Sequence, residues 1–174
     1  MKQCKKNNWL LLFAISCFLL SGCGYHLVGT GSTLPPHIKS IFIPVFENTS
    51  SQPEIHRELT SIVLQSFISD GRLKIAKKED ADLVLEGILS YYNLRNVAFS
   101  SQDLVSDIII ELEIKIKVTD QVKNEIFMEK KLKQQWDYNS TPDIADTETA
   151  RLEALDLAYN DTGNRLVSLI IDQF

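Results

Sequence analysis

Histidine, cysteine and glycine are scarce in this sequence, and their scarcity excludes several classes of functional site. The three histidines, His26, His37 and His56, lie far apart, and none stands at metal-ligand spacing from a cysteine or another histidine. Seven glycines leave little room for a phosphate-binding loop, and no serine occurs within a G-x-S-x-G motif. We therefore predict no metal site, no cofactor and no catalytic residue, and hence a protein that is not an enzyme.

Long hydrophobic runs are also missing, although one short run stands near the N-terminus. The first six residues include three lysines, and residues 9–20 are apolar except for Ser16. A run of about 12 residues would form a helix of roughly 18 Å, whereas a membrane-spanning helix needs roughly 20 residues. This layout is typical of a secretory signal peptide, which we assign to residues 1–22.

The cysteines are informative because only Cys23 would remain in the exported protein. Cys4 and Cys17 fall within the signal peptide, so the mature domain has no cysteine for a disulfide or a thiolate site. Leu20-Ser21-Gly22-Cys23 resembles the bacterial lipobox, in which the cysteine thiol receives a diacylglyceryl group, with acyl chains such as palmitate, and becomes the new N-terminus. By the same resemblance, Gly24 favours delivery to the outer membrane. The alternatives are a plain signal peptide or a buried N-terminal helix with an incidental cysteine.

Removal of the signal peptide would leave 174 − 22 = 152 residues with a formal charge of −5 − 3 = −8. That length suits one domain with a substantial core. An acidic surface argues against broad electrostatic binding of nucleic acid. We predict a lipidated N-terminus and tether over residues 23–37, where glycine and proline recur, and a single domain over residues 38–174.

Periodicity within that domain predicts five strands and two helices. The predicted strands are residues 38–46, 72–76, 83–92, 106–118 and 126–138. A capping box, Ser51-x-x-Glu54, begins the first helix, and Gly71 closes it after Asp70. The second helix follows Ser140-Thr141-Pro142-Asp143 and continues to about residue 172, and we favour one continuous helix across Gly163.

The clearest strand pattern is residues 106–118, where six apolar residues in strict alternation face five charged ones. This indicates a half-buried antiparallel strand. The strand at 83–92 places Tyr91 with its buried leucines and has Gly87 as a candidate bulge, and the strand at 126–138 places Ile126 on its apolar side. Pro44 indicates an edge or a bulge in the first strand, because proline cannot donate a ladder hydrogen bond.

The economical packing of these elements is an α+β two-layer sandwich. Two helices would pack on one mostly antiparallel sheet of about four strands. The first strand–helix–strand step leaves a parallel pairing of its two strands open.

Several segments together resemble the lipopolysaccharide-assembly lipoprotein family LptE. The resemblance is carried by residues 23–27, 34–36, 41–48, 71–73 and 81–87 and by the closing helix. It implies a fold of two helices against a four-stranded sheet and a non-catalytic role. It also implies an outer-membrane, lipid-anchored protein that faces the periplasm, plugs the β-barrel partner LptD, and binds lipopolysaccharide during its delivery to the outer leaflet.

The candidate lipopolysaccharide contacts are basic residues on the long hairpin and nearby. From residue 115 to residue 133 six lysines stand against three acids, a balance of +3. The candidates are Arg95, Lys115, Lys117, Lys123, Lys130, Lys131 and Lys133. The alternative is a solvated hairpin whose lysines discourage edge pairing. For the whole protein, the alternative function is a structural envelope lipoprotein, such as a barrel-assembly accessory or a cell-wall tether.

Overall fold

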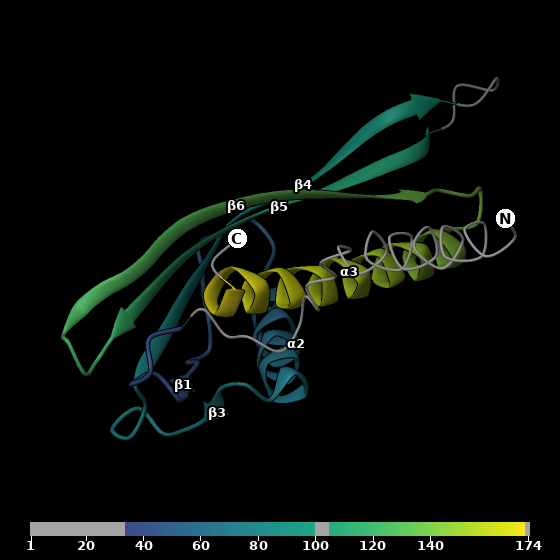
Figure 1. The fold of residues 1–174 in the computed structure, drawn as a ribbon. Helices are drawn as coiled ribbons and strands as arrows, with labels where there is room; N and C mark the ends of the chain where they lie inside the picture. Colours follow the sequence, from purple (N-terminus) through teal and green to yellow (C-terminus); the bar gives the residue numbers. More distant parts are fainter. Residues whose placement is uncertain (1–33, 100–104, 173–174) are drawn as a thin grey trace, which may run out of the picture. The chain divides into compact units, whose positions relative to one another are not determined.

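The computed structural model describes residues 34–99 and 105–172 (Figure 1). Along the chain the elements are β1 (Ser40–Phe42), β2 (Glu47–Asn48), α2 (Ile55–Asp70), β3 (Lys74–Ile75), β4 (Leu83–Phe99), β5 (Val105–Asp120), β6 (Glu125–Asn139), α3 (Ile144–Val167) and a closing π-helix (Ser168–Asp172). The expected signal peptide, Cys23 and most of the expected tether lie outside the described residues, so these assignments stay predictions.

The sheet differs from the expected one in strand number and in direction. Within residues 34–99 and 105–172 it has six strands in the order β3-β1-β4-β5-β6, with β2 also paired to β4. β1 runs parallel to both β3 and β4, and β2 runs parallel to β4, whereas β5 runs antiparallel to both of its neighbours, β4 and β6. The expectation of about four mostly antiparallel strands was therefore wrong, and the sheet is mixed.

Pro44 accounts for part of this difference. The predicted strand at 38–46 is split into β1 and β2, and Pro44 lies in the segment between them. Because proline has no N–H to donate, the ladder against β4 breaks there and resumes at Glu47, which pairs with Ile88. The parallel pairing of the strands on either side of the first helix, which the sequence left open, is confirmed by the register of Ile41 against Ile75.

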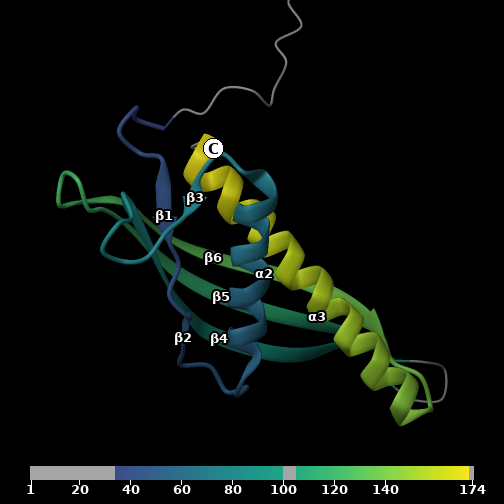
Figure 2. The same cartoon turned by 90° about the horizontal axis from the view of Figure 1, so that it is seen from below.

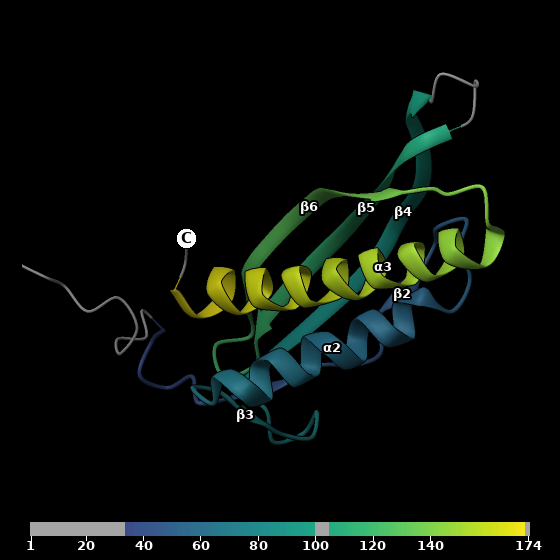
Figure 3. The same ribbon diagram turned by 90° about the vertical axis from the view of Figure 1, so that its right-hand side faces the viewer.

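Both helices lie on the same face of the sheet (Figures 2 and 3). The core lies between that face and the helices, as the α+β two-layer prediction requires. β5 contributes its alternating apolar side chains from Ile110 to Val118, which are at most 1% exposed. Leu59 and Phe67 of α2 and Leu166 of α3 are fully buried against this layer.

The helix ends follow the sequence only in part. Gly71 closes α2 in the left-handed region at φ 73°, as predicted, and Asp143 begins α3 by accepting hydrogen bonds from the amides of Ala145 and Asp146. The capping box at Ser51 does not form, because Glu54 precedes the helix at φ 69°. The Ser51 hydroxyl instead donates to the backbone oxygen of Tyr92, 3.1 Å away, and so links this loop to β4.

Gly163 does not interrupt α3, which confirms the continuous helix. The two helices touch here: a Cβ at Gly163 would overlap the Ser66 hydroxyl of α2 and lie 3.5 Å from the Ile62 carbonyl oxygen. Glycine is therefore needed where the two helices cross closely. Its greater loss of conformational entropy on folding lowers the stability of the helix, but only glycine leaves room for this buried contact.

Two irregularities in the sheet change which side chains are buried. The bulge in β4 lies around Ser90, not at Gly87, and it turns Tyr91 to the opposite face while Tyr92 becomes buried. Gly87 is small for another reason, since a Cβ there would lie 2.7 Å from three ring carbons of Phe46. A register shift between Val118 and Thr119 likewise leaves Ile126 57% exposed, so its predicted burial was wrong.

Candidate functional site

The face of the sheet opposite the helices carries the main group of candidate residues (Figure 3). We call it the open face, and it is formed by side chains of β4, β5 and β6 in rows across the three strands. From one end to the other, the rows are Glu86–Lys117–Glu129, Ile88–Lys115–Lys131, Tyr91–Glu113–Lys133, Asn93–Glu111–Gln135 and Arg95–Ile109–Asp137. Cross-strand neighbours within a row are close enough for their side chains to interact.

Three of the candidate basic residues have partners within the open face. The Lys131 ammonium lies 2.8 Å from Glu113, whose carboxylate also accepts a hydrogen bond from the Ser90 hydroxyl at 2.8 Å. The bond to Lys131, followed by that to Ser90, holds the pKa of Glu113 below its ordinary value. Lys133 stands over the Tyr91 ring with its ammonium 5.8 Å from the ring centre.

Arg95 is held in the same way further along the face. Its Nε lies 3.5 Å from a carboxylate oxygen of Glu111, and the same oxygen accepts a hydrogen bond from Gln135 at 2.6 Å. Glu111 is only 7% exposed, which is unusual for a carboxylate on an uncovered sheet face. Arg95 and Lys131 are therefore already paired with carboxylates of the protein itself, and Lys133 contacts an aromatic ring.

Lys115 and Lys117 differ from these residues. Among the described residues, neither has a carboxylate oxygen within 4 Å. Both line a groove of about 400 Å³ between β5, β4 and the segment at Pro44 and Val45. Glu47, Glu86 and Glu129 also line this groove, so its charge is mixed. Lys117 stands in register between Glu86 and Glu129, and Lys115 stands between Ile88 and Lys131, with its charge also contributing to the lowered pKa of Glu113.

The remaining two lysines do not join this group. Lys130 pairs in register with the buried Ile116 and lies on the helix side of β6, where it is exposed. Lys123 lies in the turn between β5 and β6, 3.5 Å from Glu125. The six lysines predicted on one hairpin are thus divided between two faces and a turn. Strand alternation could have separated Lys130 from Lys131, since neighbours point to opposite faces.

Sequence reasoning missed several residues of the open face. Tyr91 reaches it only because of the bulge at Ser90, and no sequence signal marks that bulge. Pro44 and Val45 line the groove because β2 pairs with β4, a contact between segments distant in sequence. Val45 is 64% exposed, which makes it the most exposed apolar side chain of the groove.

No cluster of histidine, cysteine, aspartate or glutamate within residues 34–99 and 105–172 is arranged to hold a metal ion. Across the same described ranges, we find no helix that combines the length and apolar character needed to cross a membrane.

Comparison with known proteins gives a family and a shared fold. The model of the family described as "LptE: Lipopolysaccharide-assembly" matches residues 38–173. No curated protein matches this chain.

Solved structures share the fold at low sequence identity. An uncharacterised lipoprotein B from Nitrosomonas europaea is 14% identical with a TM-score of 0.55, covering 79% of this chain and 84% of its own. A hypothetical protein from Chlamydia trachomatis is 8% identical with a TM-score of 0.55, covering 76% and 98%. A minor lipoprotein from Acinetobacter baumannii is 15% identical with a TM-score of 0.51, covering 78% and 92%.

Proposed function

This chain belongs to the lipopolysaccharide-assembly family LptE, and on that premise we propose that it is a non-catalytic outer-membrane lipoprotein that plugs an LptD-type β-barrel. In this proposal it binds lipopolysaccharide during delivery to the outer leaflet. Residues 1–22 are the signal peptide, Cys23 carries the lipid, residues 23–37 connect the anchor, and residues 38–174 are the working domain. The observation that carries the proposal is the family match, which spans almost the whole of that domain.

The open face supports a role inside a barrel. The lumen of a large outer-membrane barrel is polar and holds water. Rows of alternating charge, such as Glu86–Lys117–Glu129, can face such a wall without transferring unpaired charge into lipid. A lipid anchor in the same membrane would raise the effective concentration of the domain at the barrel, because the tether makes their association resemble an intramolecular step.

Lys115 and Lys117, which have no ion-pair partner among the described residues, are the strongest candidates for contacting lipopolysaccharide. A phosphate group approaching Lys115 need not displace an existing carboxylate partner, whereas one approaching Lys131 must compete with Glu113. Lys115 and Lys117 also border the groove whose exposed apolar side chain is Val45. We propose that this groove contacts a phosphorylated, amphipathic ligand, with Arg95, Lys131 and Lys133 as weaker contributors and Lys123 and Lys130 outside it.

Matched charge reversals test this ligand assignment. The variant K115E/K117E should bind lipopolysaccharide about tenfold or more weakly, because a lost charge-assisted contact costs about 1.5–3 kcal/mol. The control is K130E, an exposed lysine on the opposite side of the sheet. Binding would be measured with purified lipopolysaccharide and the lipidated protein. Equal affinity in the wild type and K115E/K117E would overturn the assignment.

A structural envelope lipoprotein is the second candidate, since a lipid-anchored, non-catalytic domain would fit that role as well. The two candidates predict different partners. A barrel plug should leave the membrane as a stable one-to-one complex with a large β-barrel protein, whereas a cell-wall tether should sediment with peptidoglycan.

A further inference from the structure

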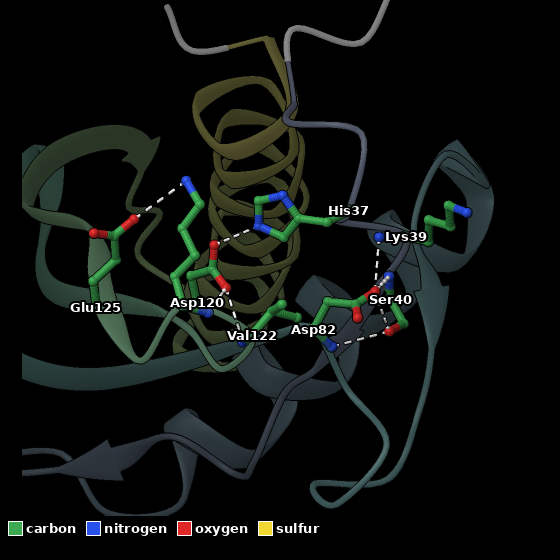
Figure 4. A network of polar contacts seen from close by, with 8 residues as sticks. His37, Lys39, Ser40, Asp82, Asp120, Val122 and Glu125 are labelled. Atoms are coloured by element: carbon green, nitrogen blue, oxygen red, sulfur yellow. Dashed lines mark hydrogen bonds and ion pairs between the residues drawn. The ribbon is translucent and has the colours of Figure 1, made fainter.

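The chain enters the domain at a fixed place beside the β5–β6 turn. Leu34 packs against the core, and Ile38 is 5% exposed with its amide donating to the Pro35 oxygen at 3.0 Å. Between them His37 Nε2 lies 2.7 Å from Asp120, a carboxylate that is 1% exposed (Figure 4). Residues 34–38 are therefore held to the domain, and only residues 24–33 separate this point from Cys23.

The acidic residues at this entry point are turned inward. Asp120 accepts the amides of Val122 and Lys123 at 2.9 and 3.0 Å. Asp82 accepts the amides of Lys39 and Ser40 at 2.8 and 3.0 Å (Figure 4). Burial alone would raise the pKa of both carboxyls, but these hydrogen bonds and the nearby His37 hold each pKa below its ordinary value. Both carboxylates are thus ionised and already have hydrogen-bond partners within the domain.

The lysines around the same place point to solvent. Gln121 joins two turns. Its backbone N–H donates to the backbone carbonyl oxygen of Asp82 at 2.8 Å, and its side-chain amide donates to the backbone carbonyl oxygen of Lys78 at 2.9 Å. The resulting surface, which we call the basic end, has exposed Lys39, Lys74, Lys77, Lys78 and Lys123 against exposed Glu79, Asp80 and Glu125. Among these exposed side chains the balance is 5 − 3 = +2, while Asp120 beneath them is paired with His37 and Asp82 is bonded to backbone amides. The side chain of Lys39 extends away from Asp82 in Figure 4. Val122, which precedes Lys123 in the sequence, is 60% exposed.

The exposed side chains of the basic end are thus net positive, whereas the whole chain carries −5. Exposed lysines at the same end of the domain as an exposed apolar side chain suit the interface of an anionic bilayer. The ammonium groups are attracted to headgroup phosphates, and a valine can enter the headgroup layer.

We propose that the basic end docks on the phospholipid headgroups of the leaflet that holds the acyl chains of Cys23. The length of chain outside the described structure supports this occupant. The step from Cys23 to Leu34 is 34 − 23 = 11 residues, which can span at most about 40 Å. β5 alone, with 16 residues, extends roughly 50 Å from this end at about 3.3 Å per residue. The anchor therefore keeps the basic end near the leaflet, and the other end of the sheet can lie far from it. This inference rests on the lipidation of Cys23 in the proposed function.

A site-directed label tests the docking directly. The lipidated V122C protein would carry a nitroxide and be reconstituted into phosphatidylcholine vesicles with or without phosphatidylglycerol. The control label is I144C, since Ile144 is 87% exposed at the start of α3 beyond the opposite end of β6. Phosphatidylglycerol should shield the label at 122 from an aqueous relaxation agent and leave the label at 144 unchanged.

Charge reversal separates lipid attraction from simple crowding by the anchor. K77E/K78E/K123E should lower the ratio of docked to free domain about tenfold or more, because each lysine near an anionic surface contributes to binding. The control variant R57E, at an exposed arginine in the first turn of α2, should retain the shielding. Docking is overturned if the labels at 122 and 144 are equally accessible in anionic vesicles, or if K77E/K78E/K123E leaves the shielding intact. An unmodified Cys23 would instead overturn the anchor in the proposed function, and mass spectrometry of the same sample distinguishes the two failures.

Discussion

Replacing Gly163 with alanine should destabilise the protein, although alanine is the better helix former. In an exposed helix the change would stabilise by about 1 kcal/mol. Here the new Cβ would overlap the Ser66 hydroxyl and lie 3.1 Å from Ser66 Cβ. The hydroxyl cannot swing away without cost, because it donates to the Ile62 carbonyl oxygen at 3.0 Å. Overpacking of a close contact costs about 1–3 kcal/mol, so we expect a net destabilisation of about 1 kcal/mol.

A double-mutant cycle with Ser66 isolates this contact. In the S66A background the overlapping oxygen is absent, and G163A should become neutral or stabilising. The coupling free energy between positions 66 and 163 should be about 1–2 kcal/mol, as is typical of residues in direct contact. Urea unfolding followed by far-UV circular dichroism measures all four proteins. If G163A stabilises by about 1 kcal/mol in both backgrounds, the close helix crossing is wrong.

Three further changes test other contacts. R72M should destabilise at neutral pH by about 1.5–3 kcal/mol, because Arg72 donates to the Asp70 carboxylate, and hydrogen bonds to charged groups contribute about that much. The hydrogen bond from Arg72 is the largest cause of the lowered folded-state pKa of Asp70. The stabilisation from this pair is therefore present above the unfolded pKa of about 4 and is lost as the pH falls further. Urea titrations of R72M and wild type should accordingly converge in acid. G87A should cost about 1–3 kcal/mol in thermal unfolding by crowding the Phe46 ring, and an unchanged midpoint would refute that contact. D143A should cost about 1 kcal/mol by removing the N-cap of α3, and no change in the unfolding midpoint would contradict the cap.

The sequence predicted most accurately where one strong local pattern agrees with the tertiary environment. β5 is such a case, because its strict alternation matches a strand with the core on one side and an uncovered face on the other. Gly71 and Asp143 were also predictable, since helix ends depend on a few neighbouring residues. The two-helix, one-sheet arrangement followed from these elements.

The errors came from contacts between distant parts of the chain. Gly87 looked like a bulge, but its reason is the Phe46 ring from another segment. The bulge at Ser90 left no signal and reversed the faces of Tyr91 and Tyr92. Pairing of β2 with β4 cannot be inferred from a two-residue strand, so this additional strand of the sheet was missed.

The candidate site was predictable to a similar extent. Four of the six hairpin lysines do share the open face, together with Arg95. The number of lysines on the hairpin could be counted from the sequence, but their partners could not. Glu113 and Glu111 neutralise Lys131 and Arg95 through cross-strand contacts, which changes the order of preference among the candidates.

Isolation of the protein from its native membranes tests the central claim most directly. Mild detergent extraction followed by intact mass spectrometry should show a diacylated N-terminal Cys23 and an equimolar complex with a large β-barrel protein. A protein with an unmodified N-terminus, or one recovered without any barrel partner and bound to peptidoglycan, would contradict the account.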